Sequence, residues 1–449
     1  MNVEKEHISQ SNTEVPLVPK GQEEQYYHQN NIEVRRLPNG ITVIGAARVV
    51  EDEHTTEIQT CFKTGAVNDP PDKIGLHHLS EHLAVNPLLS SYALSIDANM
   101  NAFTTSTGYG FSLSGIANPE VKNFGVWPLI GGYAQMLIDP LSNYPNPEEA
   151  IKKEKAIVLR ELAERNEQEE KKLEIFRNTT IFAGDNPMNF ISGGTPEGIE
   201  NIRQEDIEDL VQKVMIPNGT IVSVFSQGDP KLNAEVAKVL ADAFANFPRE
   251  ASVANPPDET LNSRLNPNFK AGAIYDCQEN ETKNVRQILF VWKFEGPDYS
   301  QEAFAIERLT PVISKKLHDW VREQGLSYGA FASASNIEGN YLWVLQFPLG
   351  ARENLQSFLK NELAKQVQHE IATIPDIELD QVNNHETLRQ LAIPMPIKNR
   401  FGLALAGLSR YGSPIDADRV KEIYTETTSE DLKKWRNTIS QTNPAILIF

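Results

Sequence analysis

The feature that most constrains the fold of this chain is a proline-rich loop near its middle. Pro248, Pro256, Pro257 and Pro267 interrupt every regular pattern between residues 248 and 270. Before this loop, predicted strands give way to helices, and after it the same order returns. A chain of 449 residues is also too long for one compact core. The sequence therefore predicts two α+β domains of one plan, joined by a linker.

The predicted boundaries follow from where the patterns begin and end. Residues 1–30 are rich in Glu, Gln, Asn and Ser, and we expect a mobile tail there. Residues 31–247 form the first predicted domain, which opens with a hairpin. Residues 248–270 are the predicted linker, and residues 271–449 are the second predicted domain.

Composition narrows the classes of function. Lys and Arg number 42 against 61 Asp and Glu, a net charge of −19, which disfavours a nucleic acid as partner. The polar N-terminus and the lack of a long apolar run predict no membrane partner. The two cysteines, Cys61 and Cys277, are not in a paired motif, so we expect neither a disulfide framework nor a cysteine metal site. A reduced, cytoplasmic compartment is the default expectation.

The strongest chemical signal is the segment His78-x-x-Glu81-His82, the reversed order of a zinc-protease signature. On a helix, His78 and His82 lie one turn apart on one face, and Glu81 lies beside them. Two imidazoles can chelate Zn²⁺, and a carboxylate that is not a ligand can take a proton from water. The alternative is an ordinary solvated helix face.

Two histidines do not complete a catalytic zinc site, which usually has three protein ligands. Residues 147–174 have the pattern of a long charged helix, with Ala156, Ile157, Leu159 and Leu162 on its expected apolar face. Glu154 and Glu161 are two turns apart on this helix and so share one face. Packing against the histidine helix would bring them to the metal, but spacing alone equally fits a solvated acidic face.

With these residues placed, the chain resembles the pitrilysin-type zinc metallopeptidases. Residues 75–83 follow the family pattern Gly-Leu-x-His-Phe-Leu-Glu-His-Met, and residues 154–162 resemble its downstream Glu-containing element. The resemblance makes Glu161 the third zinc ligand beside His78 and His82. It makes Glu154 a supporting acid behind the ligands.

The resemblance extends to substrate binding and fold. Asn101, Ala102 and Phe103 resemble an edge strand on which a peptide substrate adds as an extra strand. The family fold implies two similar α+β domains, each a mostly antiparallel sheet packed with helices, forming half of a clam-shell chamber. A chain of this length then needs a second copy or a related subunit, so a homodimer or a heterodimer is expected.

Some residues depart from the family pattern. Ser80 stands where an apolar residue is usual, and Leu83 where Met is usual. The family places an Arg and a Tyr seven residues apart to hold the substrate carbonyl. Here Arg322 and Tyr328 are six apart, so the role carries over to Tyr328 more safely than to Arg322.

Together with the motif, the resemblance implies a zinc-dependent endopeptidase that hydrolyses peptides or unfolded segments inside an enclosed chamber. Glu81 would be the general base, and Tyr328 with Arg322 would stabilise the oxyanion. The competing class is a non-catalytic or partner-dependent subunit with the same fold. Such relatives usually lose the zinc motif, whereas this chain keeps its predicted residues.

Overall fold

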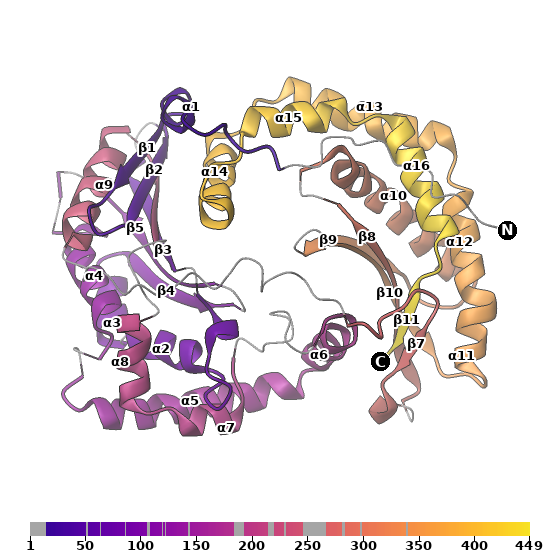
Figure 1. The fold of residues 1–449 in the computed structure, drawn as a ribbon, viewed down its shortest axis with the longest axis horizontal. Helices are drawn as coiled ribbons and strands as arrows, with labels where there is room; N and C mark the ends of the chain where they lie inside the picture. The colour runs from indigo at the N-terminus through magenta and orange to yellow at the C-terminus, as the bar shows by residue number, and fades with distance from the viewer. Residues whose placement is uncertain are drawn as a thin grey trace.

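The computed structural model describes residues 15–245 and 266–449 apart from short gaps. The gaps are residues 51–52, 63, 86, 106–107, 119, 122, 142–143, 184–192, 214–219, 229, 281–282, 297–298 and 338–339. Most of the predicted linker, residues 248–265, lies outside the described part of the chain. Figure 1 shows two sheets on opposite sides of an open ring of helices.

The first sheet has six strands in the order β1-β2-β6-β3-β5-β4. These are β1 (Ile32–Arg36), β2 (Thr42–Arg48), β3 (Thr55–Phe62), β4 (Ala98–Thr104), β5 (Tyr109–Ile116) and β6 (Ile221–Gln227). Only β2 and β6 pair in parallel, and the other neighbours are antiparallel. Strand β4 lies at the edge.

Nine helices belong to the first half of the described chain. They are α1 (Glu23–Gln29), α2 (Leu76–Ala84), α3 (Pro87–Ser95), α4 (Ile130–Ile138), α5 (Pro147–Glu167), α6 (Glu169–Ile181), α7 (Pro196–Asn201), α8 (Gln204–Lys213) and α9 (Pro230–Phe244). Helices α4 and α9 cover one face of the first sheet, with Tyr133 and Phe244 among the fully buried side chains.

The second sheet has five strands in the order β7-β11-β8-β10-β9. These are β7 (Ile274–Asp276), β8 (Val285–Glu295), β9 (Phe331–Ile337), β10 (Asn340–Gly350) and β11 (Ala445–Ile448). The helices of the second half of the chain are α10 (Gln301–Glu323), α11 (Leu355–Phe358), α12 (Ala364–Ala372), α13 (Asp376–Ala392), α14 (Ile397–Tyr411), α15 (Ala417–Glu426) and α16 (Ser429–Gln441). The predicted fold class, α+β with mostly antiparallel sheets packed with helices, is confirmed.

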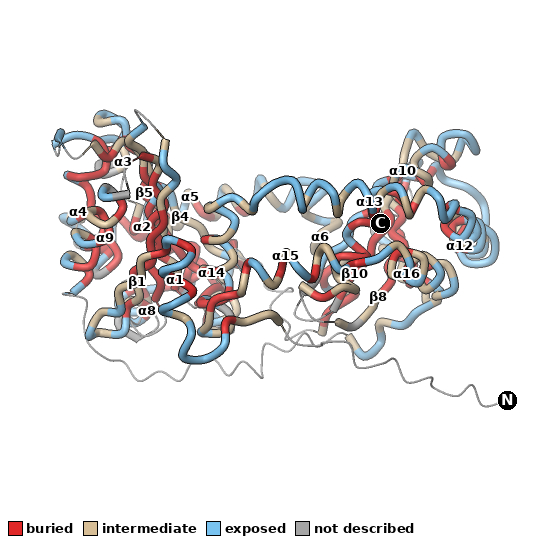
Figure 2. Tube along the Cα trace, turned by 90° about the horizontal axis from the view of Figure 1, so that it is seen from above, coloured by how far each residue is buried: buried red, intermediate tan, exposed pale blue. Residues whose placement is uncertain are grey.

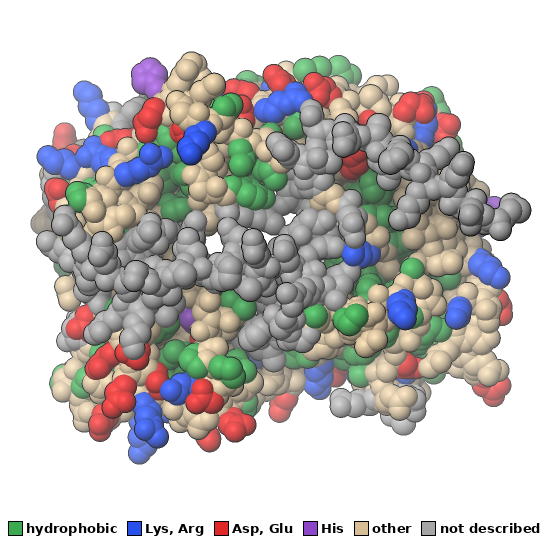
Figure 3. Space-filling view, in the orientation of Figure 1, with side chains coloured by type: hydrophobic (Ala, Val, Ile, Leu, Met, Phe, Trp, Pro, Cys, Tyr) green, Lys and Arg blue, Asp and Glu red, His purple; other side chains and the backbone are tan. Residues whose placement is uncertain are grey.

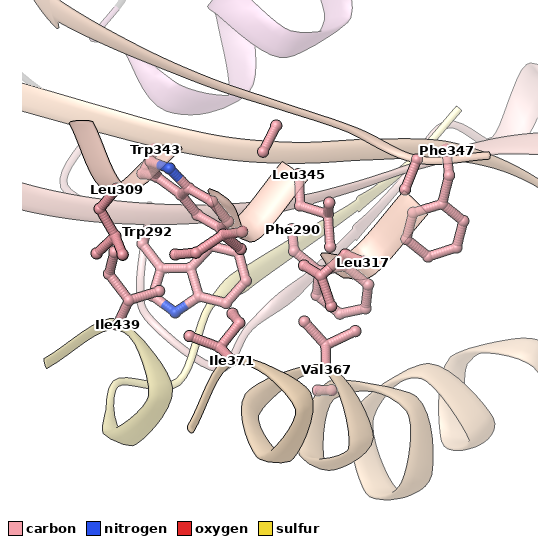
Figure 4. Close-up of a cluster of buried hydrophobic side chains, with 14 of the residues drawn as sticks. Phe290, Trp292, Leu309, Leu317, Trp343, Leu345, Phe347, Val367, Ile371 and Ile439 are labelled. Atoms are coloured by element: carbon pink, nitrogen blue, oxygen red, sulfur yellow. The ribbon is translucent and has the colours of Figure 1, made fainter. Parts of the chain in front are cut away.

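Strand β8 shows why the second sheet is buried on both faces. Phe290 and Trp292 point into a core with α10, α12 and α16, where Trp292 meets Trp343 edge to face at 5.0 Å (Figure 4). Leu289 and Val291 alternate with them and join a second core on the other face. Both faces are therefore apolar, as a central covered strand requires.

The two halves exchange helices. Helix α6 of the first half contributes Ile181 to the core on the second sheet, beside Leu289. Helix α14 of the second half contributes Phe401 to the core on the first sheet, beside Ile44. Figure 2 shows the buried residues in two masses, with more exposed residues along the helices that connect them. Thus α6 and α14 each pack on the sheet of the opposite half rather than on the sheet nearest to them in the sequence.

Three sequence expectations need correction. The expected tail at residues 1–30 is wrong from residue 15 onward: Tyr26 and Tyr27 of α1 are buried, and Tyr26 Oη donates to Ile415 O at 3.0 Å. The helical spacing of the apolar residues over 119–139 predicts one helix there, but α4 begins only at Ile130, after a glycine with φ 65° at position 125 and a 3-10 turn at Trp127–Leu129. The helix expected at 147–174 is broken at Gln168, whose extended backbone separates α5 from α6.

Cys61 and Cys277, the two cysteines of the chain, are both unpaired. Within the described residues, no helix is long and apolar enough to cross a bilayer. On the face shown in Figure 3, acidic and basic side chains intermingle around the rim.

Candidate metal centre

Helix α2 carries the predicted motif and begins at a glycine that no other residue could replace without strain. Gly75 has φ 109°, and a Cβ there would lie 2.9 Å from Gly194 Cα and 2.5 Å from Ile199 Cδ1. The Asp69 carboxylate accepts from Gly75 N at 2.7 Å and from His77 N at 3.1 Å. These bonds satisfy backbone donors at the first turn and fix where the helix starts.

A buried polar network supports this first turn. His77 Nδ1 donates to Asp69 Oδ1 at 2.5 Å, and His77 Nε2 lies 2.8 Å from Thr64 Oγ1. The side chains of His77 and Asp69 are 0% exposed. The order Thr–His–Asp is that of a nucleophilic triad, but a substrate has no access to these groups. The network therefore links the end of β3, the following loop and α2.

Helix α5 presents its acids to α2. Its buried face consists of Ala150, Ile151, Glu154, Val158 and Leu162, and it shares a core with Leu79 and Leu83 of α2. The expected apolar face was partly wrong: Leu162 is buried, but Ala156 is exposed. The helix is rotated so that Glu154 is only 6% exposed and Glu161 lies one turn beyond Val158 on the same side.

His78, His82 and Glu161 come together in space. Glu161 Oε2 lies 3.6 Å from His78 Nε2 and 3.5 Å from His82 Nε2. One nitrogen or oxygen atom from each of the three residues lies within 4.8 Å of the others. The two imidazole rings meet edge to face at 4.8 Å. The predicted ligand set thus converges on one point.

Each of the three side chains has a second contact, made by an atom that does not face the other two. His78 Nδ1 donates to Gly193 O at 3.0 Å, and His82 Nδ1 lies 3.5 Å from Glu154 Oε2. Arg165 Nη1 donates to Glu161 Oε1 at 3.2 Å. These contacts occupy the outer atoms and leave both Nε2 atoms and Glu161 Oε2 facing inward, the arrangement that orients ligands in metal sites.

The electrostatics of the cluster are set by its acids. Burial of His82 acts to lower its pKa, whereas its contact with the Glu154 carboxylate acts to raise it. The charges of Glu81 and Glu161 add to that contact, and the pKa of His82 is raised above its usual value. The site therefore attracts positive charge.

These residues fit zinc. Two imidazole nitrogens and one carboxylate oxygen are a donor set of catalytic zinc, with a fourth position left for water. Ligand atoms about 2.0–2.2 Å from a tetrahedral ion lie roughly 3.3–3.6 Å apart. The 3.5 and 3.6 Å separations around Glu161 Oε2 match that spacing and are long for hydrogen bonds.

Glu81 joins α2 to the edge strand. Thr104 Oγ1, at the end of β4, donates to Glu81 Oε2 at 2.6 Å. On the same strand Asn101 is exposed and Ala102 and Phe103 are partly buried. Ala102 N donates to Asn101 Oδ1 at 2.9 Å rather than to a strand on that side. The predicted substrate strand therefore ends beside the predicted base.

Arg322 and Tyr328 lie apart from this cluster. They flank the turn from α10 to β9, in the half across the ring from α2 (Figure 1). The Arg322 guanidinium lies 5.0 Å from the centre of the Tyr328 ring, and Tyr328 is 83% exposed. Among the described residues, no hydrogen bond or ion pair joins either side chain to the metal cluster. The two are neighbours despite their shorter spacing.

Sequence reasoning missed several supporting residues. Asp69, His77 and Gly193 were given no role, although Asp69 lies in the turn-like Asn-Asp-Pro-Pro segment, and Thr104 was expected only as the last residue of the Asn-Ala-x-Thr edge-strand pattern. Ser80, noted as a departure from the family pattern, is fully buried and accepts from Tyr109 Oη at 3.1 Å. Gly193 carried no local signal, because its role depends on distant packing.

Comparisons with known proteins agree with this fold. The family described as "Peptidase M16 inactive domain" matches residues 201–384. A protease from Helicobacter pylori has a similar structure, with TM-score 0.68 and 14% identity over 93% of this chain and 99% of that one. A peptidase M16 inactive domain from Pseudomonas fluorescens gives TM-score 0.69 and 15% identity, over 93% and 97%. These matches confirm the half clam-shell fold.

Pitrilysin is a longer relative in structure. It aligns with TM-score 0.62 and 17% identity over 93% of this chain but only 44% of its own. No curated protein matches the chain by sequence. The segment matched by the family, residues 201–384, does not include His78, His82 or Glu161. Its description as inactive therefore concerns a part of the chain that holds no residue of the metal cluster.

Proposed function

We propose that this chain is a zinc-dependent endopeptidase of the M16 type, which hydrolyses peptides or unfolded segments inside an enclosed chamber. The observation that carries the proposal is the convergence of His78, His82 and Glu161, in which Glu161 Oε2 lies 3.6 and 3.5 Å from the two histidine Nε2 atoms. Glu81 lies on the same turn as the two histidines, next to the end of β4. The fold of residues 201–384 and of the whole chain supports the same class.

The roles of the residues follow from their positions. His78, His82 and Glu161 would hold zinc, and Glu154 would orient His82. When bound, zinc supplies a Lewis acid that activates water and polarises the peptide carbonyl. Glu81 accepts the proton that the attacking water loses and returns it to the amine of the cleaved bond. Thr104 holds the Glu81 carboxylate in place for both transfers.

Substrate binding would use both halves. A peptide would add as a strand along β4, displacing the Asn101 side chain from Ala102 N. Tyr328 Oη, with Arg322 beside it, would donate to the oxyanion once the halves close on the substrate. The high exposure of Tyr328 in the open ring supports a group that is covered only by a ligand or partner.

The proposal includes a dimer. Pitrilysin spans more than twice the part that this chain covers, which supports a second copy or a related subunit completing the chamber. Light scattering of the purified chain should give the mass of a dimer, alone or with its partner. The cytoplasmic location expected from the cysteine content stays a prediction.

The test uses two substitutions and one control on the purified chain. Glu81→Gln should keep one equivalent of zinc and lose activity by at least about a thousandfold, because the base is removed and the ligands are not. Glu161→Gln should lose the metal. Glu164→Gln, an exposed acid on the same helix, should change neither. Full activity in the metal-bound Glu81→Gln variant would disprove the mechanism.

The second candidate is a non-catalytic or partner-dependent subunit. The matched family is described as inactive, and its segment, residues 201–384, holds Arg322 and Tyr328, which supports a chain that depends on a partner. Metal content and peptidase activity, measured first on the chain alone and then with a related subunit, distinguish the active enzyme from the non-catalytic or partner-dependent subunit. A chain that binds zinc but cleaves only after mixing is partner-dependent. A chain that binds no zinc is the non-catalytic form.

A further inference from the structure

A second site lies on the other half of the molecule, away from the candidate metal centre. A cavity of about 500 Å³ opens where β7, the start of β8 and the start of α11 meet. Its polar and charged lining residues include Asp276, Lys283, Arg286, Arg352, Gln356 and Ser357. Three of its four charged residues are cationic, whereas acids outnumber bases 61 to 42 in the whole chain.

Arg286 is the buried element of this site. It is 4% exposed, and its Nη2 atom donates to Asp276 Oδ1 at 2.6 Å and to Cys277 O at 3.1 Å. Its Nε atom has no hydrogen-bond partner among the described residues. A buried guanidinium N–H without an acceptor is unfavourable, so Arg286 is a cation of the cavity wall whose hydrogen bonding is incomplete.

The one acid of the cavity is already occupied. Asp276 Oδ1 accepts from Arg286, and Asp276 Oδ2 accepts from Gln356 Nε2 at 2.9 Å. With both oxygens engaged, the carboxylate opposes a bound anion less than a free acid would. It also holds Arg286 and Gln356 in fixed positions at the cavity wall.

The outer donors remain available. The Arg352 guanidinium lies 3.8 Å from the centre of the Phe358 ring, a contact that uses the face of the group and leaves its edge N–H donors free. Ser357 Oγ accepts from Asn361 Nδ2, so its own O–H can donate. Lys283 also lines the cavity, and Glu169 of α6 pairs with it and offsets its charge.

We propose that this cavity binds a phosphoryl group, either as free phosphate or as a phosphate ester. Three cationic side chains, two of them paired with acids, and a hydroxyl line one space, and phosphate offers several acceptor oxygens to their N–H and O–H donors. A carboxylate has only two oxygens and one charge. The cavity is larger than one phosphate requires, which leaves room for the rest of an ester.

The test is calorimetric titration of the full chain with inorganic phosphate and with glucose 6-phosphate at constant ionic strength, with acetate as the anion control. Arg352→Gln should weaken phosphate binding about tenfold, because it removes a charge-assisted donor, and Lys283→Gln should weaken it as well. Lys365→Gln, an exposed cation on α12 outside the cavity, should bind as the wild type.

The outcomes are distinct. Tighter binding of glucose 6-phosphate than of phosphate identifies an ester as the ligand, and equal binding identifies the free ion. Phosphate that binds no better than acetate overturns the proposal. Unchanged binding in both Arg352→Gln and Lys283→Gln places the anion elsewhere and also overturns it. Because binding is measured without peptide cleavage, the result is independent of the proposed peptidase activity.

Discussion

His77 is the residue that best shows how single side chains prepare this site. It precedes a predicted zinc ligand, yet it faces away from the cluster and is completely buried between Asp69 and Thr64. Its partner Asp69 also accepts from Gly75 N and His77 N, so one carboxylate serves three donors. A buried group with so many bonds is expensive to disturb.

Asp69→Asn should destabilise the protein by about 3 kcal/mol, because an amide presents only one acceptor and leaves a buried donor unpaired. Asp72→Asn, an exposed acid in the same loop, should change the free energy of unfolding by less than about 0.5 kcal/mol. Urea denaturation of the two variants measures the difference. Equal stabilities would mean that the network does not support α2.

The burial of Cys61 predicts that its thiol reacts slowly with alkylating reagents. Burial raises the pKa of the Cys61 thiol to about 11. Because the thiolate is the reactive form, alkylation by iodoacetamide at pH 8 should be about a hundredfold slower in the folded protein than in the unfolded chain. Mass spectrometry of the Cys61 peptide gives both rates. Similar rates would show that the thiol is open to solvent.

At the level of elements, the start of α2 and the loop before α7 are built against each other. Gly75 and Gly194 both have positive φ, and a Cβ on Gly194 would lie 2.6 Å from Gly75 Cα. The same loop supplies Gly193 O to His78 Nδ1. Close backbone contact between these segments therefore sets the direction of a predicted ligand.

Gly75→Ala should cost about 1–3 kcal/mol of stability and weaken zinc binding at least tenfold, because the helix start must shift. Gly131→Ala in α4 is the control: its Cβ would meet nothing within 4 Å, so it should be neutral or stabilise by up to about 1 kcal/mol. Thermal unfolding and metal titration check both variants. A Gly75→Ala protein with normal zinc affinity would refute the argument.

At the level of the whole molecule, the exchange of α6 and α14 ties the halves into one unit. Each sheet has one face covered by a helix from the other half. A fragment that ends in the linker would expose the face that α14 covers. We therefore expect the halves to unfold together rather than in separate transitions.

Phe401→Ala tests this coupling. Phe401 is 5% exposed, and its ring centre lies 5.9 Å from that of Phe225 in the first sheet. The cavity should cost about 3–5 kcal/mol, and hydrogen exchange should accelerate in β1 and β2 as well as in α14. Phe331→Ala, at a 65% exposed position, should have little effect. Faster exchange confined to the second half would contradict a single cooperative unit.

The sequence by itself determined what depends on local spacing. His78 and His82 share a face because they are one helical turn apart, and Glu154 and Glu161 share one because they are two turns apart. The alternation of strands and helices around a proline-rich loop was enough to predict two α+β units. The choice of Glu161 as third ligand came from the family resemblance, since spacing alone left a solvated face open.

Only the tertiary structure decided which distant segments meet. In the structure, the acids of α5 face α2, and Gly193 and Thr104 contact His78 and Glu81 of α2. Helices α6 and α14 pack on the sheets of the opposite halves. Periodicity reports which side of an element is apolar, but many partners can cover the same apolar side. The choice among them is made by the packing of all elements at once, which no local pattern records.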